Sequence, residues 1–110
     1  MAMLLESAPQ SEAQSQAQSD MASVVKQLTH PMGLVGVRTT REHLTALLPI
    51  VNRQEFTGED LDAELRRVGV RGCVSFRVVE KFKCRLRDLK VARALPERRG
   101  TWQNVMRLTW

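Results

Sequence analysis

The sequence predicts a small α+β domain in which helices come first and a β-hairpin closes the chain. Its 110 residues are 43% hydrophobic and only 5% aromatic, which suits one modest core. Apolar residues recur every three or four positions between residues 20 and 89, as in amphipathic helices. In the last predicted strand Met106, Leu108 and Trp110 instead alternate with Val105, Arg107 and Thr109, as in a half-buried strand.

The first 19 residues are expected to form a disordered tail, and residues 20–110 the folded domain. Residues 6–20 are rich in Ser, Gln, Ala and Glu and contain no branched apolar side chain. Such a segment buries too little surface to offset the conformational entropy lost on folding. A frayed helix is the alternative, although a helix without an apolar stripe is marginal alone.

The first expected helix begins at Asp20, which can cap it, and ends before Pro31. Its apolar stripe consists of Met21, Val24, Val25 and Leu28. This stripe needs a partner, which is found either within the fold or in a homodimer formed through residues 20–30. The segment 32–37 that follows is expected to be a loop or a short strand.

A second helix is predicted to start with a T-x-x-E capping box formed by Thr39 and Glu42. Pro49 should end or kink this helix. After a short extended piece at residues 55–56, Thr57 is expected to cap another helix that has acidic residues in its first turn. Gly69 is the expected end of that helix.

The most basic of the predicted helices covers residues 75–89, with Ser75 as its cap. The apolar positions expected to face the core are Phe76, Val79, Phe82, Leu86 and Leu89. The opposite face carries Arg77, Lys81, Cys84, Arg85 and Asp88, with Lys83 and Arg87 at its sides. Considered alone, such a face is more often merely solvated, with local ion pairs.

A hairpin follows, made of strands over 91–95 and 101–110 and joined by the turn PERRG. Arg98 and Arg99 lie at the tip of this turn, where no partner is expected for them. In the last strand Trp110 is expected in the core. Trp102 is expected either in the core or at an exposed position, where its ring would stack on bases or contact a partner.

Charge is segregated along the chain, and the net charge is +5. Residues 71–110 contain eleven Lys and Arg against three acidic residues, whereas the rest of the chain is slightly acidic. The positive excess therefore lies in the basic helix and the hairpin. A surface of this kind favours an anionic partner.

The order of elements resembles the winged helix-turn-helix domain over residues 38–110, about two thirds of the chain. The segments that carry the resemblance are FTGEDLDAEL, VSFRVVEKFKCRLRDLKVARAL and PERRGTWQNVMRLTW. The chain departs from the family pattern after the basic helix, where Lys90 or Val91 stands in place of the usual Gly.

The resemblance implies a double-stranded DNA-binding regulator, or by analogy a phage or plasmid accessory factor. The basic helix would then enter the major groove, and the hairpin would form a wing that contacts the DNA backbone. Spaced four apart, Arg77, Lys81 and Arg85 are the expected readers of bases. The predicted nucleic-acid-binding set is Arg77, Lys81, Lys83, Arg85, Arg87, Arg98 and Arg99.

Catalytic chemistry is not expected, nor are a metal or a cofactor. The histidines are His30 and His43, and Cys73 and Cys84 lie eleven residues apart, outside the usual metal-ligand spacings. Neighbouring cations can lower the pKa of the Cys84 thiol, but no base is spaced to activate it. No membrane segment or targeting peptide is expected, and the predicted location is the cytoplasm or the nucleoid.

The main alternative function is a basic adaptor that binds an acidic protein and never contacts DNA. RNA binding is a third class, for which a single-stranded ligand would be preferred over duplex DNA.

Overall fold

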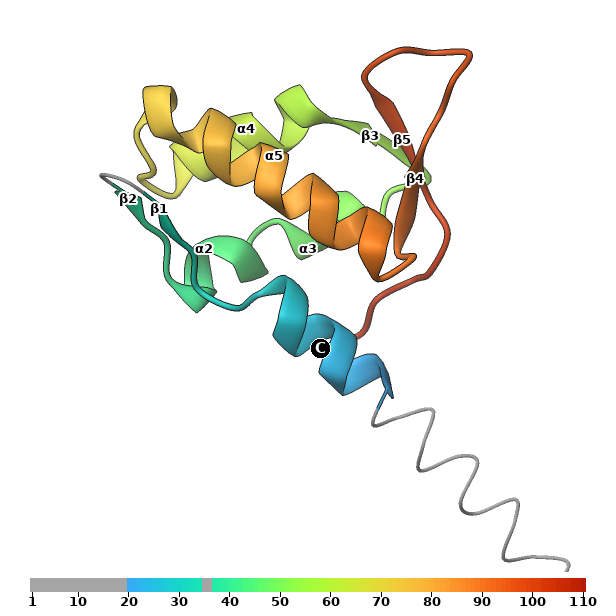
Figure 1. Ribbon diagram of the computed structural model, residues 1–110, viewed down its shortest axis with the longest axis horizontal. Helices are drawn as coiled ribbons and strands as arrows, with labels where there is room; N and C mark the ends of the chain where they lie inside the picture. Colours follow the sequence, from blue (N-terminus) through green and yellow to red (C-terminus); the bar gives the residue numbers. More distant parts are fainter. Residues whose placement is uncertain (1–19, 35–36) are drawn as a thin grey trace, which may run out of the picture.

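The computed structural model describes residues 20–34 and 37–110, which form a mixed α+β fold (Figure 1). The predicted tail over residues 1–19 lies outside the described residues. After a helix over residues 20–28, the elements are β1 (Gly33–Leu34), β2 (Val37–Arg38), α2 (Arg41–Thr45), α3 (Leu48–Val51), β3 (Glu55–Thr57), α4 (Gly58–Arg67), α5 (Gly72–Asp88), β4 (Ala92–Ala94) and β5 (Thr101–Asn104). None of the described helices is long and apolar enough to cross a membrane.

The helix over residues 20–28 is confirmed, and it packs on the rest of the domain. Leu28 is fully buried, and the other residues of its stripe, Met21, Val24 and Val25, pack against the core. The Thr29 hydroxyl donates a 2.8 Å hydrogen bond to the carbonyl of Val25 at the end of the helix. The apolar stripe therefore finds its partner inside the fold.

The cap of α2 is Thr40, one residue after the predicted Thr39. The Thr40 hydroxyl accepts a hydrogen bond from the N–H of His43, and Nδ1 of His43 accepts one from the N–H of Thr40. Thr39 is buried instead, and its hydroxyl accepts a 3.0 Å hydrogen bond from the N–H of Met32. The predicted box with Glu42 is therefore wrong, because histidine takes the place of the acid.

Pro49 interrupts the helical region as predicted, in a specific way. Helix α2 ends at Thr45, and α3 begins at Leu48 with Pro49 in its first turn. Proline is tolerated there because the N–H groups of the first turn have no partner within a helix. Leu44, Leu47 and Leu48 are fully buried at this junction.

The sheet has three antiparallel strands in the order β3-β5-β4, so the hairpin predicted at the C-terminus gains a strand from the middle of the chain. The extended piece predicted at residues 55–56 is that strand. Trp102 of β5 pairs with Phe56 of β3 and with Ala94 of β4. Phe56 is buried, whereas Trp102 is half-buried and packs against the core.

The last six residues do not continue the predicted strand. The Asn52 amide donates to the carbonyl of Leu108 at 2.8 Å and accepts from its N–H at 2.7 Å, so a side chain replaces a neighbouring strand. Leu108 is buried, but Trp110 is 61% exposed. The core position predicted for Trp110 is therefore wrong, because β5 ends at Asn104 and the alternation of buried and exposed positions does not continue past Leu108.

Helix α4 is confirmed at both ends. Thr57 and Asp60 form a capping box at the start. At the end, Gly69 has φ +103, and the N–H of Val70 donates to the carbonyl of Leu65. This is the arrangement in which glycine ends helices most readily, and it leads at once into α5.

Helix α5 begins at Gly72, so Ser75 is not its cap. Ser75 is fully buried and donates a hydrogen bond to the Asp62 carboxylate on α4. The buried apolar residues of α5 are Val78, Val79, Phe82 and Leu86. Phe76, predicted to face the core, is 64% exposed. It lies six residues before Phe82, so the two side chains point about 120° apart around the helix.

The end of α5 uses the same backbone arrangement as the end of α4, but with a lysine. The N–H of Val91 donates to the carbonyl of Leu86 at 2.9 Å. Lys90 takes the left-handed conformation with φ 59. For a residue with a Cβ atom this conformation costs about 1–2 kcal/mol. The helix therefore ends at the position where the family pattern has glycine.

Candidate nucleic-acid interface

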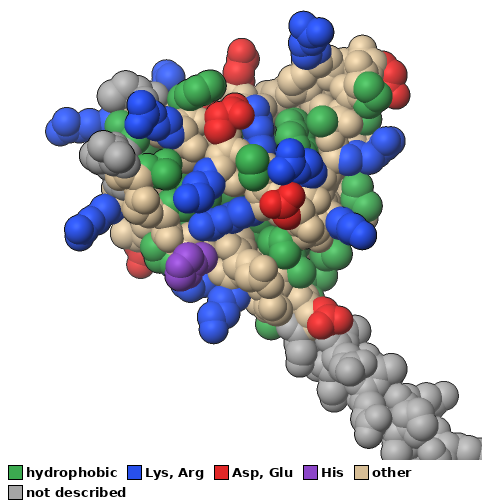
Figure 2. All heavy atoms as spheres, viewed as in Figure 1, with side chains coloured by type: hydrophobic (Ala, Val, Ile, Leu, Met, Phe, Trp, Pro, Cys, Tyr) green, Lys and Arg blue, Asp and Glu red, His purple; other side chains and the backbone are tan. Residues whose placement is uncertain are grey.

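The outward face of α5 carries basic side chains that have no acidic partner among the described residues. Arg77 and Lys81 are exposed and lie four residues apart, on the same side of the helix. Within residues 20–34 and 37–110, no carboxylate forms an ion pair with either. Figure 2 shows Lys and Arg side chains spread over the face on which α5 lies, with fewer acidic side chains among them.

Arg85 forms main-chain hydrogen bonds that the sequence did not predict. Its Nη1 donates to the carbonyl of Leu28 at 3.1 Å and to that of His30 at 2.8 Å. Burial lowers the pKa of the guanidinium, although it stays charged at neutral pH. Arg85 thus ties α5 to the end of the helix over residues 20–28.

Lys83 and Arg87 lie beside the outward face and are paired on their own helix. The Lys83 ammonium is 3.1 Å from the Glu80 carboxylate, and only 21% of its side chain is exposed. It extends across the start of α4, where a Cβ atom on Gly58 would lie 2.8 Å from its Nζ. Arg87 pairs with Asp88 at 3.3 Å, and both of these side chains are exposed.

The turn over residues 95–100 separates its two arginines. Arg98 forms a two-pronged ion pair with Glu55 of β3, one contact of which measures 2.8 Å. The expectation that Arg98 has no partner is therefore wrong. Arg99 is exposed and lines a groove together with Gly100, which has φ +87.

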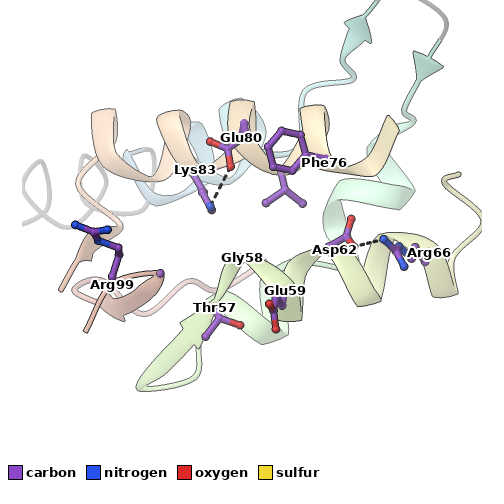
Figure 3. Close-up of a pocket in the computed structure, with 11 residues that line it drawn as sticks. Thr57, Gly58, Glu59, Asp62, Arg66, Phe76, Glu80, Lys83 and Arg99 are labelled. Carbon is purple, nitrogen blue, oxygen red and sulfur yellow. Dashed lines mark hydrogen bonds and ion pairs between the residues drawn. The ribbon is translucent and has the colours of Figure 1, made fainter. Parts of the chain in front are cut away.

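That groove lies between the start of α4, the outer side of α5 and the turn over residues 95–100, and its volume is about 580 Å³ (Figure 3). Phe76 and Val79 form the apolar part of the groove wall. Most of the charges in the wall are paired with each other, Asp62 with Arg66 at 2.9 Å and Glu80 with Lys83. The groove is thus close to neutral, whereas the face beside it is basic.

No protein-family model, curated protein or solved structure matches this chain.

The described part of the chain contains no group of three or more His, Cys, Asp or Glu side chains that could hold a metal ion. His43 uses its Nδ1 to cap α2. Cys84 is a free, exposed thiol on the outward face of α5.

The seven predicted residues thus fall into three groups. Arg77, Lys81 and Arg87 lie on the exposed side of α5, and Lys83 and Arg99 line the groove. Arg85 and Arg98 are tied to other parts of the fold. Phe76 was expected in the core, and its place in the wall of the groove was not predicted. The helical period could have predicted the exposure of Phe76, because the alternative apolar stripe through residues 75, 78, 79, 82 and 86 leaves Phe76 outside it.

Proposed function

We propose that this chain binds double-stranded DNA, with α5 in the major groove and the turn over residues 95–100 on the DNA backbone. The observation that carries the proposal is the pair Arg77 and Lys81 on the outward side of α5, both exposed and without a carboxylate partner in the described residues. Unpaired cations on one exposed helix face suit phosphates, and arginine also suits the guanine edge.

The anchoring of α5 supports the same proposal, because a helix that enters a groove must be held from behind. Its inner side is buried through Val78, Phe82 and Leu86, and Ser75 fixes it to Asp62 of α4. With 17 residues, the helix is about 25 Å long. The major groove of B-DNA is wide enough for such a helix.

The arrangement of elements is also in keeping with a winged helix-turn-helix domain, to which we assign this chain as part of the proposal. A strand precedes α4, the α4–α5 pair follows, and the sheet order is β3-β5-β4. In this assignment residues 95–100 form the wing. Arg99 is then the wing residue that contacts phosphate, while Arg98 holds the wing to β3 through Glu55.

The test is a fluorescence titration of a random 20-base-pair duplex at several salt concentrations. Each phosphate that the protein neutralises contributes about −0.9 to the slope of log affinity against log salt. The double substitution Arg77→Ala, Lys81→Ala should therefore reduce the magnitude of the slope by about 1.8. The matched control is Arg53→Ala, Arg107→Ala, which removes the same charge from exposed positions outside α5.

An equal effect of the two double variants would mean that only net charge matters, and α5 would lose its assigned role. Absence of duplex binding at low salt would overturn the proposal and leave the basic adaptor as the alternative. Preference for a single-stranded RNA over the duplex would indicate the third class.

A further inference from the structure

We infer that Phe76 contacts the 5-methyl group of thymine in the major groove and so makes binding sensitive to thymine. The inference rests on the proposed function and adds a specificity to it. Phe76 is not one of the seven residues that the sequence predicted to bind nucleic acid.

The aromatic ring of Phe76 is exposed on the surface of α5. In the described part of the chain the exposed large hydrophobic side chains are Phe76, Val105 and Trp110. Of these, Phe76 lies on α5 and lines the groove, and it is 64% exposed. Figure 3 shows it on α5 beside Glu80 and Lys83, across the opening from α4.

Most of the charged side chains that line the groove with Phe76 are paired with each other. Within the groove, Glu80 is paired with Lys83 and Asp62 with Arg66. Phosphates gain little from such a neutral wall, whereas the uncharged edges of bases are compatible with it. Arg77, the next residue, instead presents an unpaired cation suited to a phosphate or a guanine.

Phe76 lies near the N-terminus of α5. Phe76 is the fifth residue of α5, which begins at Gly72. When a helix enters the major groove, the residues near its N-terminus contact the base edges. Only thymine presents a methyl group there, and aromatic side chains are among its apolar partners.

Uracil pairs like thymine but lacks the methyl group, so it isolates the contact. Removing one buried methyl group from an interface weakens binding about fourfold. The probe is the duplex that the wild-type chain enriches from a random library, with each thymine replaced singly by uracil. Wild type should lose about fourfold in affinity at one or two positions, and Phe76→Ala should lose nothing at those positions.

Val105→Ala is the matched control, because Val105 is exposed outside α5 and should leave the uracil effect unchanged. A uracil effect that persists in Phe76→Ala would assign it to the DNA itself and overturn the inference. Duplex binding by wild type without any uracil effect would overturn the inference alone. If no duplex is bound or enriched, both the inference and the proposed function fall.

Discussion

The two sides of α5 carry the same kind of residue in different states. On the side that meets the helix over residues 20–28, the Arg85 guanidinium donates to two main-chain carbonyls and is partly buried. On the outward side, Arg77 is exposed and has no carboxylate partner in the described residues. One arginine holds the fold together, and the other is available to a ligand.

The turn over residues 95–100 repeats this contrast between neighbours. Arg98 pairs with Glu55, while Arg99 faces the groove. Basic residues in a cluster are therefore not equivalent. What distinguishes them is whether a carbonyl or a carboxylate from another part of the chain lies within reach.

The strongest test of the two sides compares Leu86→Asp with Phe76→Asp. Leu86 is fully buried, so an aspartate there places an unpaired charge in the core and should lower the free energy of unfolding by about 4 kcal/mol or more. Phe76 is 64% exposed, so Phe76→Asp should change stability by less than about 1 kcal/mol. Thermal melts followed by circular dichroism check both, and similar losses would mean that α5 is oriented differently.

A smaller effect is expected for Arg85→Ala, which removes two hydrogen bonds from a charged donor. The free energy of unfolding should fall by about 1–3 kcal/mol, whereas Arg77→Ala should stay within about 0.5 kcal/mol of wild type. Urea unfolding measures both. Equal stabilities would remove the contrast between the two arginines.

The smallest effects are expected in the turn. Arg98→Ala removes an ion pair whose Arg and Glu side chains are 60% and 34% exposed, so the loss should not exceed about 1 kcal/mol and should shrink with added salt. Arg99→Ala should leave stability unchanged and weaken duplex binding more than Arg98→Ala does. The reverse order of binding losses would show that Arg98 leaves Glu55 to contact DNA.

Local signals in the sequence were enough for much of the fold. The helix from Asp20, the cap at Thr57, the stop at Gly69 and the break around Pro49 are all confirmed, because each depends on a few neighbouring residues. The start predicted for α5 at Ser75 was wrong, because the contact that Ser75 makes is not with neighbouring residues. Ser75 resembles a cap locally, but its partner Asp62 lies on the preceding helix.

The same distinction explains the site. Exposure of Arg77 and Lys81 follows from the helical period, so the sequence predicted it. The partners of Arg85 are main-chain carbonyls more than fifty residues earlier, and Glu55 lies 43 residues before Arg98. Such contacts exist only after the chain has folded, and no local sequence pattern predicts them.

The left-handed lysine at the end of α5 has a practical consequence for engineering. Lys90→Gly removes the steric cost of that conformation while adding the backbone entropy of glycine to the unfolded chain, so a net gain of about 0.5–1 kcal/mol is expected. A raised melting temperature would check it, and no change would mean that the lysine conformation is unstrained. Such a stabilised parent would keep weakened variants folded long enough for their ligand binding to be measured on its own.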